Sequence, residues 1–125
     1  MQFRDQIPIY LQIADIICEN ILLKQWLPEQ RIPSIRDFAT QLIVNPNTIV
    51  RTYEFLEQKR IIMNQRGIGF SITKNGYELV LEYKKEDFIK KELPHFFRQL
   101  YLLDLDIQAL EDDFNTFSEN YNKEL

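Results

Sequence analysis

Apolar side chains near the start of the chain recur every three or four residues. One face of a helix would collect Tyr10, Ile13, Ala14, Ile17 and Ile21. Pro8 precedes them, and proline suits the first turn of a helix because no backbone N–H is needed there. The pattern therefore predicts a helix that begins near Pro8 and buries this face.

Two shorter helices are predicted next, each with its own start signal. Ser34 follows Pro33 and has Asp37 three residues on, which is the spacing of a capping box. Asn45 and Pro46 are a good N-cap and a good first helical residue. The inward faces would contain Ile35, Phe38, Ala39, Leu42 and Ile43, and then Ile49, the methyl of Thr52, Tyr53 and Leu56. Two short helices joined by a tight turn predict a helix-turn-helix.

After Lys59 the hydrophobic period changes from that of a helix to that of a strand. Residues 61–65 and 68–72 form two short apolar runs around Arg66 and Gly67. Two such runs separated by a glycine-containing turn predict a β-hairpin, and a hairpin directly after the third helix is a wing.

The rest of the chain is predicted to be helical, with a break at Pro94 in the pattern over residues 77–103. Asp106 can cap a last helix, in which apolar residues alternate at spacings of three and four, like a heptad seam. A lone terminal helix would expose too much apolar surface, so we expect a homodimer. The predicted dimerisation residues are Phe96, Phe97, Leu100, Ile107, Leu110, Phe114, Phe117 and Tyr121.

These elements predict a mainly α fold with a small β-hairpin. Residues 1–73 would form a winged helix-turn-helix DNA-binding domain, and residues 74–125 a helical dimerisation appendage. About 50 residues are too few to bury an independent ligand-binding core, so any small-molecule effector, whose identity is unknown, would bind between helices at the dimer interface.

The net charge of −4 conceals an uneven distribution. Residues 31–72 carry six basic and three acidic side chains, a net charge of +3. Residues 73–125 carry seven basic and twelve acidic side chains, a net charge of −5. A polyanion would meet the first part and be repelled by the second.

The candidate DNA-binding residues are Ser34, Arg36, Asn45, Asn47, Thr48, Arg51, Arg66 and Gly67. Exposed amides and a guanidinium at the start of the second predicted helix can bind phosphate, unless Arg36 pairs with Asp37 instead. The first turn of the third helix is where a recognition helix meets base edges. Arg51 could equally pair with Glu54. An arginine beside glycine at the wing tip can enter a narrow minor groove, although a solvent-exposed turn has the same sequence.

Other classes of function find little support in the sequence. Cys18 is the only cysteine and lies among isoleucines, which favours a core residue and a reducing, cytoplasmic location. His95 is the only histidine and lacks a nucleophile motif, and the acidic residues near the end lack calcium-loop spacing. We expect no catalytic site, metal site or cofactor. We also expect no export signal and no contact with a membrane, since no apolar run approaches 18 residues.

Four segments resemble the GntR family of bacterial transcription regulators, and the short C-terminal part resembles its YtrA subfamily. They begin at Pro8 (PIYLQI), Ile32 (IPSIR), Val44 (VNPNTI) and Arg66 (RGIG), in the order of the family. The chain departs from the family at Lys24, Glu29 and Arg60, where glycine is usual. Arg60 matters most, because a left-handed backbone is common after the third helix.

The resemblance implies a repressor that covers a palindromic operator as a dimer, of a kind often found beside transporter operons. Two alternatives remain open. The chain could be a winged-helix adaptor that binds proteins rather than DNA. It could instead be a small-molecule sensor or an unrecognised enzyme that uses its C-terminal aromatic residues.

Overall fold

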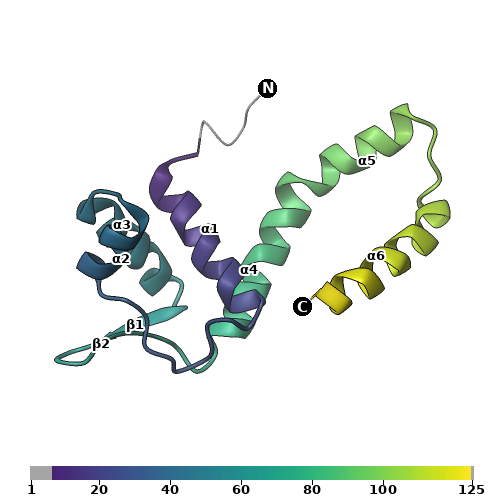
Figure 1. Cartoon of the computed structure of the whole chain (residues 1–125). Coiled ribbons are helices and arrows are strands. Elements are labelled where there is room, and N and C mark those ends of the chain that lie inside the picture. The colour runs from purple at the N-terminus through teal and green to yellow at the C-terminus, as the bar shows by residue number, and fades with distance from the viewer. Residues whose placement is uncertain (1–6, 125) are drawn as a thin grey trace. The chain divides into compact units, whose positions relative to one another are not determined.

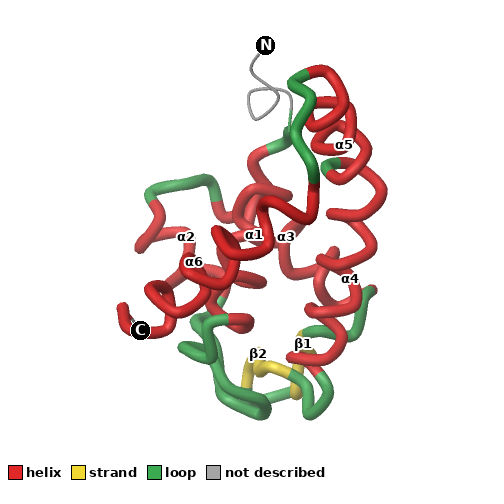
Figure 2. The backbone as a smooth tube through the Cα atoms, turned by 90° about the vertical axis from the view of Figure 1, so that its right-hand side faces the viewer, coloured by secondary structure: helices red, strands yellow, loops and turns green. Residues whose placement is uncertain are grey.

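A computed structural model describes residues 7–124, with side chains for residues 7–121. The chain divides into two compact units, the first ending at Lys84 and the second starting at Lys85. In chain order the elements are α1 (Ile9–Leu22), α2 (Ile35–Leu42), α3 (Pro46–Gln58), β1 (Ile62–Gln65), β2 (Gly69–Ile72) and α4 (Gly76–Lys91), followed by α5 (Leu93–Leu102), the 3₁₀ turn η2 (Ile107–Leu110) and α6 (Glu111–Glu124). The mainly helical fold with one hairpin is as the sequence predicts (Figures 1 and 2).

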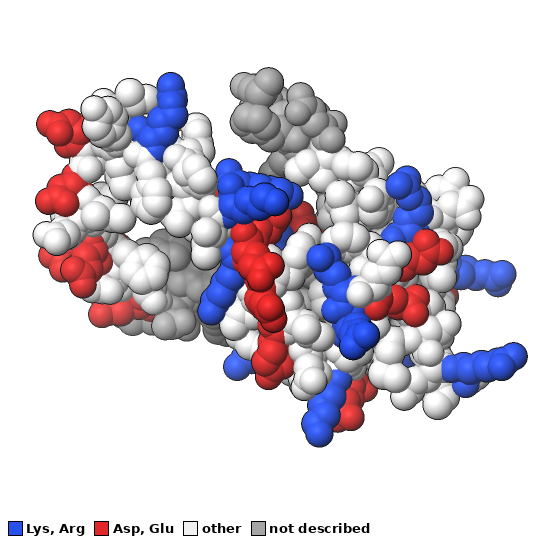
Figure 3. Space-filling model, turned by 180° about the vertical axis from the view of Figure 1, so that it is seen from behind, with Lys and Arg blue, Asp and Glu red and all other residues white. Residues whose placement is uncertain are grey.

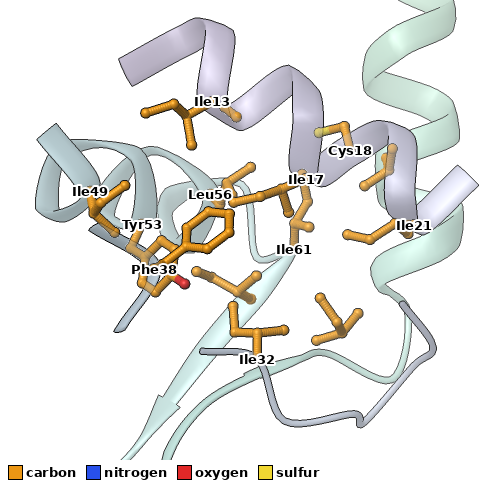
Figure 4. Close-up of a cluster of buried hydrophobic side chains, with 14 of the residues drawn as sticks. Ile13, Ile17, Cys18, Ile21, Ile32, Phe38, Ile49, Tyr53, Leu56 and Ile61 are labelled. Atoms are coloured by element: carbon orange, nitrogen blue, oxygen red, sulfur yellow. The ribbon is translucent and has the colours of Figure 1, made fainter. Parts of the chain in front are cut away.

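The core of the first unit lies between α1 and α3. Ile17 and Cys18 of α1 and Ile49, Tyr53 and Leu56 of α3 belong to this core, and all of them are almost completely buried (Figure 4). Phe38 of α2 and Ile61 at the entry to the hairpin complete the cluster. The buried faces follow the helical period of the sequence, because residues three and four apart share one side of a helix.

Cys18 is a core residue, as its neighbours in the sequence suggest. Burial raises the pKa of its thiol to about 12, and this effect outweighs the opposing attraction of Lys84. A neutral thiol at physiological pH is a poor nucleophile, so Cys18 acts as a small apolar side chain.

The first unit extends beyond residue 73, where the sequence places the boundary between the two parts. Val80 of α4 is fully buried in the core formed by α1 and α3. The Lys84 ammonium also forms an ion pair of 2.9 Å with Asp15 of α1. Burial alone would lower the pKa of Lys84, but the hydrogen bond and the attraction of Asp15 raise it. The first half of α4 is therefore part of the helix-turn-helix unit.

Several helix boundaries are fixed by local residues, as predicted. Pro94 lies in the first turn of α5, where the long helical pattern breaks. Asp106 accepts a hydrogen bond of 3.0 Å from the Gln108 amide and so starts η2, which runs directly into α6. Gly76 lies buried in the first turn of α4.

A left-handed backbone is found at all three positions where the GntR family, which the sequence resembles, usually has glycine. Lys24, Glu29 and Arg60 have φ values of 61°, 66° and 62°. Ile43, which ends α2, has a φ of 56° and is the single β-branched residue of the described chain in this conformation. Its side chain is also 90% exposed, so it is not the inward residue that the helical period predicts. A β-branched side chain is especially disfavoured there, because its two branches crowd the backbone.

Replacing Ile43 with glycine is expected to stabilise the protein. Removing the side chain should relieve about 1–2 kcal/mol of backbone strain, less the entropy that glycine adds to the unfolded chain. The net gain of about 1 kcal/mol corresponds to a rise in melting temperature of roughly 4–8 °C for a unit of this size. Thermal unfolding followed by circular dichroism measures it. The matched control is Ile43→Ala, which keeps a Cβ and should gain much less. Equal or lower stability of Ile43→Gly would contradict the strain.

Candidate nucleic-acid interface

Helix α2 begins at the first of the predicted DNA-binding positions. The Ser34 hydroxyl accepts a hydrogen bond of 3.1 Å from the Asp37 amide, and its backbone is extended. Arg36 is exposed and forms no ion pair with Asp37 or with any other described carboxylate. The guanidinium is therefore available to an external anion, and the alternative of an Arg36–Asp37 pair is not observed.

Helix α3 begins with an exposed polar turn. The Asn45 side chain accepts a hydrogen bond of 2.8 Å from the Asn47 amide, and Pro46 occupies the first turn. Asn47 is exposed, and Thr48 is half-buried. Asn45 therefore caps α3. The side chain of Asn47, which ends in a carboxamide, is exposed. An exposed carboxamide can both donate and accept hydrogen bonds, which is what reading adenine in the major groove requires.

Two hydroxyl groups fix the position of α3 in the first unit. The Tyr53 hydroxyl donates a hydrogen bond of 2.7 Å to the Pro33 carbonyl, directly before the start of α2. The Thr52 hydroxyl lies 2.8 Å from the Tyr10 carbonyl of α1. Burial raises the pKa of Tyr53, so its hydroxyl stays protonated and remains a donor. The sequence pattern placed both residues in the core but gave no indication of these bonds.

One cation of α3 and one at its C-cap lie over aromatic rings. The Arg51 guanidinium carbon lies 4.2 Å from the centre of the Tyr10 ring, and no described ion pair joins it to Glu54. The Lys59 ammonium lies 4.2 Å from the centre of the Tyr83 ring. Stacking on a ring holds a cation without neutralising it, so Arg51 stays both ordered and charged.

The hairpin has the register of a short wing. Gln65 pairs with Gly69, and Ile62 pairs with Ile72. The turn closes through a hydrogen bond of 2.8 Å from the Ile68 amide to the Gln65 carbonyl. Gly67 has a φ of 81°, a value that side chains disfavour, and Arg66 beside it is exposed. Arg66 and Gly67 therefore lie at the tip, as the sequence predicts. Figure 3 shows basic side chains projecting from the end of the first unit that carries the hairpin.

Arg31 is a further exposed cation of this unit that the sequence analysis did not single out. Arg31 lies in the segment between α1 and α2 and pairs with Ser71 of β2 in an antiparallel bridge. The available signal was the change in burial along this segment, where Ile32 is buried between the exposed Arg31 and the partly buried Pro33.

The second unit exposes most of the residues predicted for dimerisation. Phe96, Phe97 and Ile107 are about half exposed, and Phe114 and Phe117 are 66% and 62% exposed. The rings of Phe117 and Tyr121 stack at 5.8 Å between centroids, and Leu110 is half-buried. Leu100 differs, because it is only 7% exposed within the chain. An apolar surface of this extent, rich in aromatic rings, is typical of a protein interface.

Metal ligation and membrane crossing find no candidate in the described part of the chain. No three His, Cys, Asp or Glu residues there are grouped so that they could hold a metal ion. None of the helices between residues 7 and 124 is long and apolar enough to cross a membrane.

Comparison with known proteins assigns the family. Residues 9–72 match the family described as bacterial regulatory proteins, gntR family, which covers the helix-turn-helix and the wing. The chain is 39% identical over 118 residues to the uncharacterized regulator YhcF of Bacillus subtilis, across 94% of this chain and 96% of that one. The chain belongs to the GntR family.

Other members of the GntR family support the YtrA-like assignment. The transcriptional repressor YtrA of Bacillus subtilis is 32% identical over 87% of this chain and 83% of its own. The crystal structure of a GntR regulator from Bacteroides thetaiotaomicron has a TM-score of 0.74 and 44% identity, and covers 91% of this chain and 99% of that one.

The fold of the first unit is also similar to that of a protein solved in complex with DNA. The DNA-binding domain of AraR, bound to an operator, has a TM-score of 0.51 and 25% identity over 54% of this chain and 81% of that one. The relatives named above are transcription regulators rather than enzymes. The chain is thus a winged helix-turn-helix transcription regulator of the GntR family with a YtrA-like C-terminal part.

Proposed function

We propose that this GntR regulator is a repressor that binds a palindromic duplex operator as a homodimer. The observation that carries the proposal is the set of exposed polar and basic side chains at the starts of α2 and α3 and at the wing tip. Arg36, Asn47 and Arg66 are all exposed, and neither of the two arginines forms an ion pair with a described carboxylate. Repression follows from occupancy, because a dimer that covers an operator excludes the transcription machinery.

The chemistry of each element assigns it a different part of the DNA. The exposed guanidinium at the start of α2 suits a phosphate, since a planar fork of donors matches the phosphate oxygens. The carboxamide of Asn47 suits a base edge. Arg66 beside Gly67 suits the minor groove, where negative potential is high and space is narrow. Asn45 and Ser34 cap their helices, and Thr48 and Arg51 would add contacts along α3.

The operator is expected to have two-fold symmetry. Each protomer would place one α3 in a major groove, so half-site centres should lie about one helical turn apart, ~10 bp, or a small multiple of it. The proposed target is a transporter operon and the proposed location is the cytoplasm, as the resemblance to the family implies. Repression, as distinct from activation, is supported by the similarity to the repressor YtrA. No small-molecule effector is assigned.

Two alanine variants separate positioning on DNA from base reading. Arg36→Ala should weaken binding to every duplex and lower the slope of log K against log salt by about one unit, because one phosphate contact releases about one counterion. Asn47→Ala should cost about 1–3 kcal/mol on an operator selected from random DNA and much less on a random duplex. Salt titrations by fluorescence anisotropy, with both duplexes, measure these effects.

The outcomes of this experiment distinguish the two roles. Both variants should melt close to the unaltered protein, since neither side chain is buried. If Asn47→Ala loses equal affinity on both duplexes, the residue positions the protein and reads no base. If the unaltered protein binds no duplex at all, the adaptor alternative gains and the proposal is wrong.

A further inference from the structure

The segment that leads into α2 runs beside β2 and pairs with it through one isolated antiparallel bridge, Arg31 with Ser71. The Glu29 amide donates a hydrogen bond of 2.8 Å to the Ile72 carbonyl, the Ile72 amide donates to the Gln30 carbonyl at 2.9 Å, and the Ile32 amide donates to the Phe70 carbonyl at 2.9 Å. This alternation of bonds is that of an antiparallel ladder. The backbone of Arg31 is therefore held against β2 and close to the start of α2.

The Arg31 side chain lies over the backbone of Gly69. A Cβ placed on Gly69 would come within 3.4 Å of both Nε and Nη2 of Arg31. Gly69 also has a φ of 117°, which side chains rarely adopt. The absence of a side chain at Gly69 thus leaves room for the guanidinium against the wing, two residues from Gly67 at its tip.

The charge of Arg31 is not compensated within the described chain. The two ion pairs there join Lys84 to Asp15 and Lys91 to Asp87. Arg31 itself is exposed. It lines an open hollow of about 550 Å³ together with Trp26, Gln30, Ile32, Pro33, Ser34, Asp37 and Gln41. Asp37 contributes a carboxylate to the same hollow but does not pair with Arg31.

We propose that Arg31 binds a DNA backbone phosphate that lies between the wing and the start of α2. This inference rests on the proposed function, because it adds a contact to the same interface. An uncompensated guanidinium with five donors, ordered over a glycine and flanked by the wing tip and Ser34, fits a phosphate diester better than a neutral base edge. The contact would join the wing and the helix-turn-helix on one stretch of DNA backbone and would carry no sequence preference of its own.

Salt titration of Arg31→Ala tests the contact. A 24-bp duplex of random sequence and a duplex selected for binding are titrated between 50 and 200 mM NaCl. The salt slope should fall by about one unit on both duplexes. The affinity ratio of unaltered protein to variant should therefore shrink about 3- to 4-fold across this range, in accordance with the loss of one counterion. Arg31→Lys should keep the salt slope, since it keeps the charge, and lose only part of the affinity.

A matched control removes a charge elsewhere. Lys85 is exposed and begins the second unit, so Lys85→Ala should leave the slope and the affinity unchanged. A scan of single methylphosphonate substitutions along the selected duplex adds an independent readout. At least one position should weaken the unaltered protein and leave Arg31→Ala unaffected, because the variant has already lost that contact.

The outcomes separate this inference from the proposed function. An unchanged slope and affinity for Arg31→Ala, with normal DNA binding by the unaltered protein, would overturn the phosphate contact alone. A loss on the selected duplex only would also overturn it, in favour of base reading. Failure of the unaltered protein to bind either duplex would overturn the proposed function and this contact together. If the alanine variant folds poorly, Arg31→Gln, which removes the charge but keeps a long polar side chain, gives the same test of the salt slope.

Discussion

Replacing both Phe114 and Phe117 with glutamate is expected to produce a monomer and to weaken operator binding at least 100-fold. These two rings of α6 are 66% and 62% exposed in the chain and lie one helical turn apart. We expect a second protomer to cover both rings in the dimer. Two carboxylates in such an apolar seam would lose their hydration without gaining a partner, which a dimer of moderate affinity cannot tolerate.

The loss of affinity for DNA follows from the loss of the dimer. When two α3 helices are linked, the second half-site binds at a local concentration in the millimolar range, and linkage of this kind contributes about 10²- to 10⁴-fold. A monomer has only one half-site contact. Sedimentation velocity measures the oligomeric state at tens of micromolar, and anisotropy with the selected duplex measures the affinity.

A control with the same added charge distinguishes the seam from general repulsion. Asn115 and Asn120 lie on α6 and are exposed, so Asn115→Glu with Asn120→Glu adds two negative charges to the same helix. This control should remain dimeric and lose little affinity. A monomeric unaltered protein, or a dimer that persists in the phenylalanine double variant, would refute the predicted dimer surface.

Replacing Gly76 with alanine is expected to destabilise the first unit by about 3 kcal/mol. A Cβ at this position would lie 2.6 Å from Cγ2 of Ile72 and 3.1 Å from the carbonyl oxygen of Ile61. Ile72 is completely buried, and the Ile61 carbonyl belongs to the backbone directly before β1. Overpacking of a core costs about 1–3 kcal/mol, and the upper end is expected where the neighbours are fixed.

The melting temperature should fall accordingly. A loss of this size corresponds to roughly 12–24 °C for a unit of about this length. This result would be opposite to helix propensity, because alanine is otherwise preferred to glycine inside a helix. The control is Lys74→Ala in the exposed turn just before α4, which should change stability by less than about 0.5 kcal/mol. A Gly76→Ala variant as stable as the control would show that α4 can shift away from β2.

Sequence alone determined the elements whose causes are local. Ser34, Asn45 with Pro46, Pro94 and Asp106 each start a helix or a helical turn through contacts within a few residues. The spacing of isoleucines along α1 and of Ile49, Tyr53 and Leu56 along α3 gave the buried faces, because the period of a helix is fixed by its backbone. Arg66 and Gly67 were placed at the wing tip for a similar reason, since a glycine with positive φ is what the turn needs.

The tertiary structure decided what depends on residues far apart in the chain. The pairing of Arg31 with Ser71, the bond from Tyr53 to Pro33 and the stacking of Arg51 on Tyr10 join positions separated by 40, 20 and 41 residues. Hydrophobic period carries no information about such partners, because it shows only which side of an element is buried. For the same reason the sequence could not show that Leu100 is buried, that Val80 brings α4 into the first unit, or that Gly76 is fixed by contact with Ile72. Local chemistry thus set the elements and their faces, and long-range packing set which polar groups remain exposed for DNA.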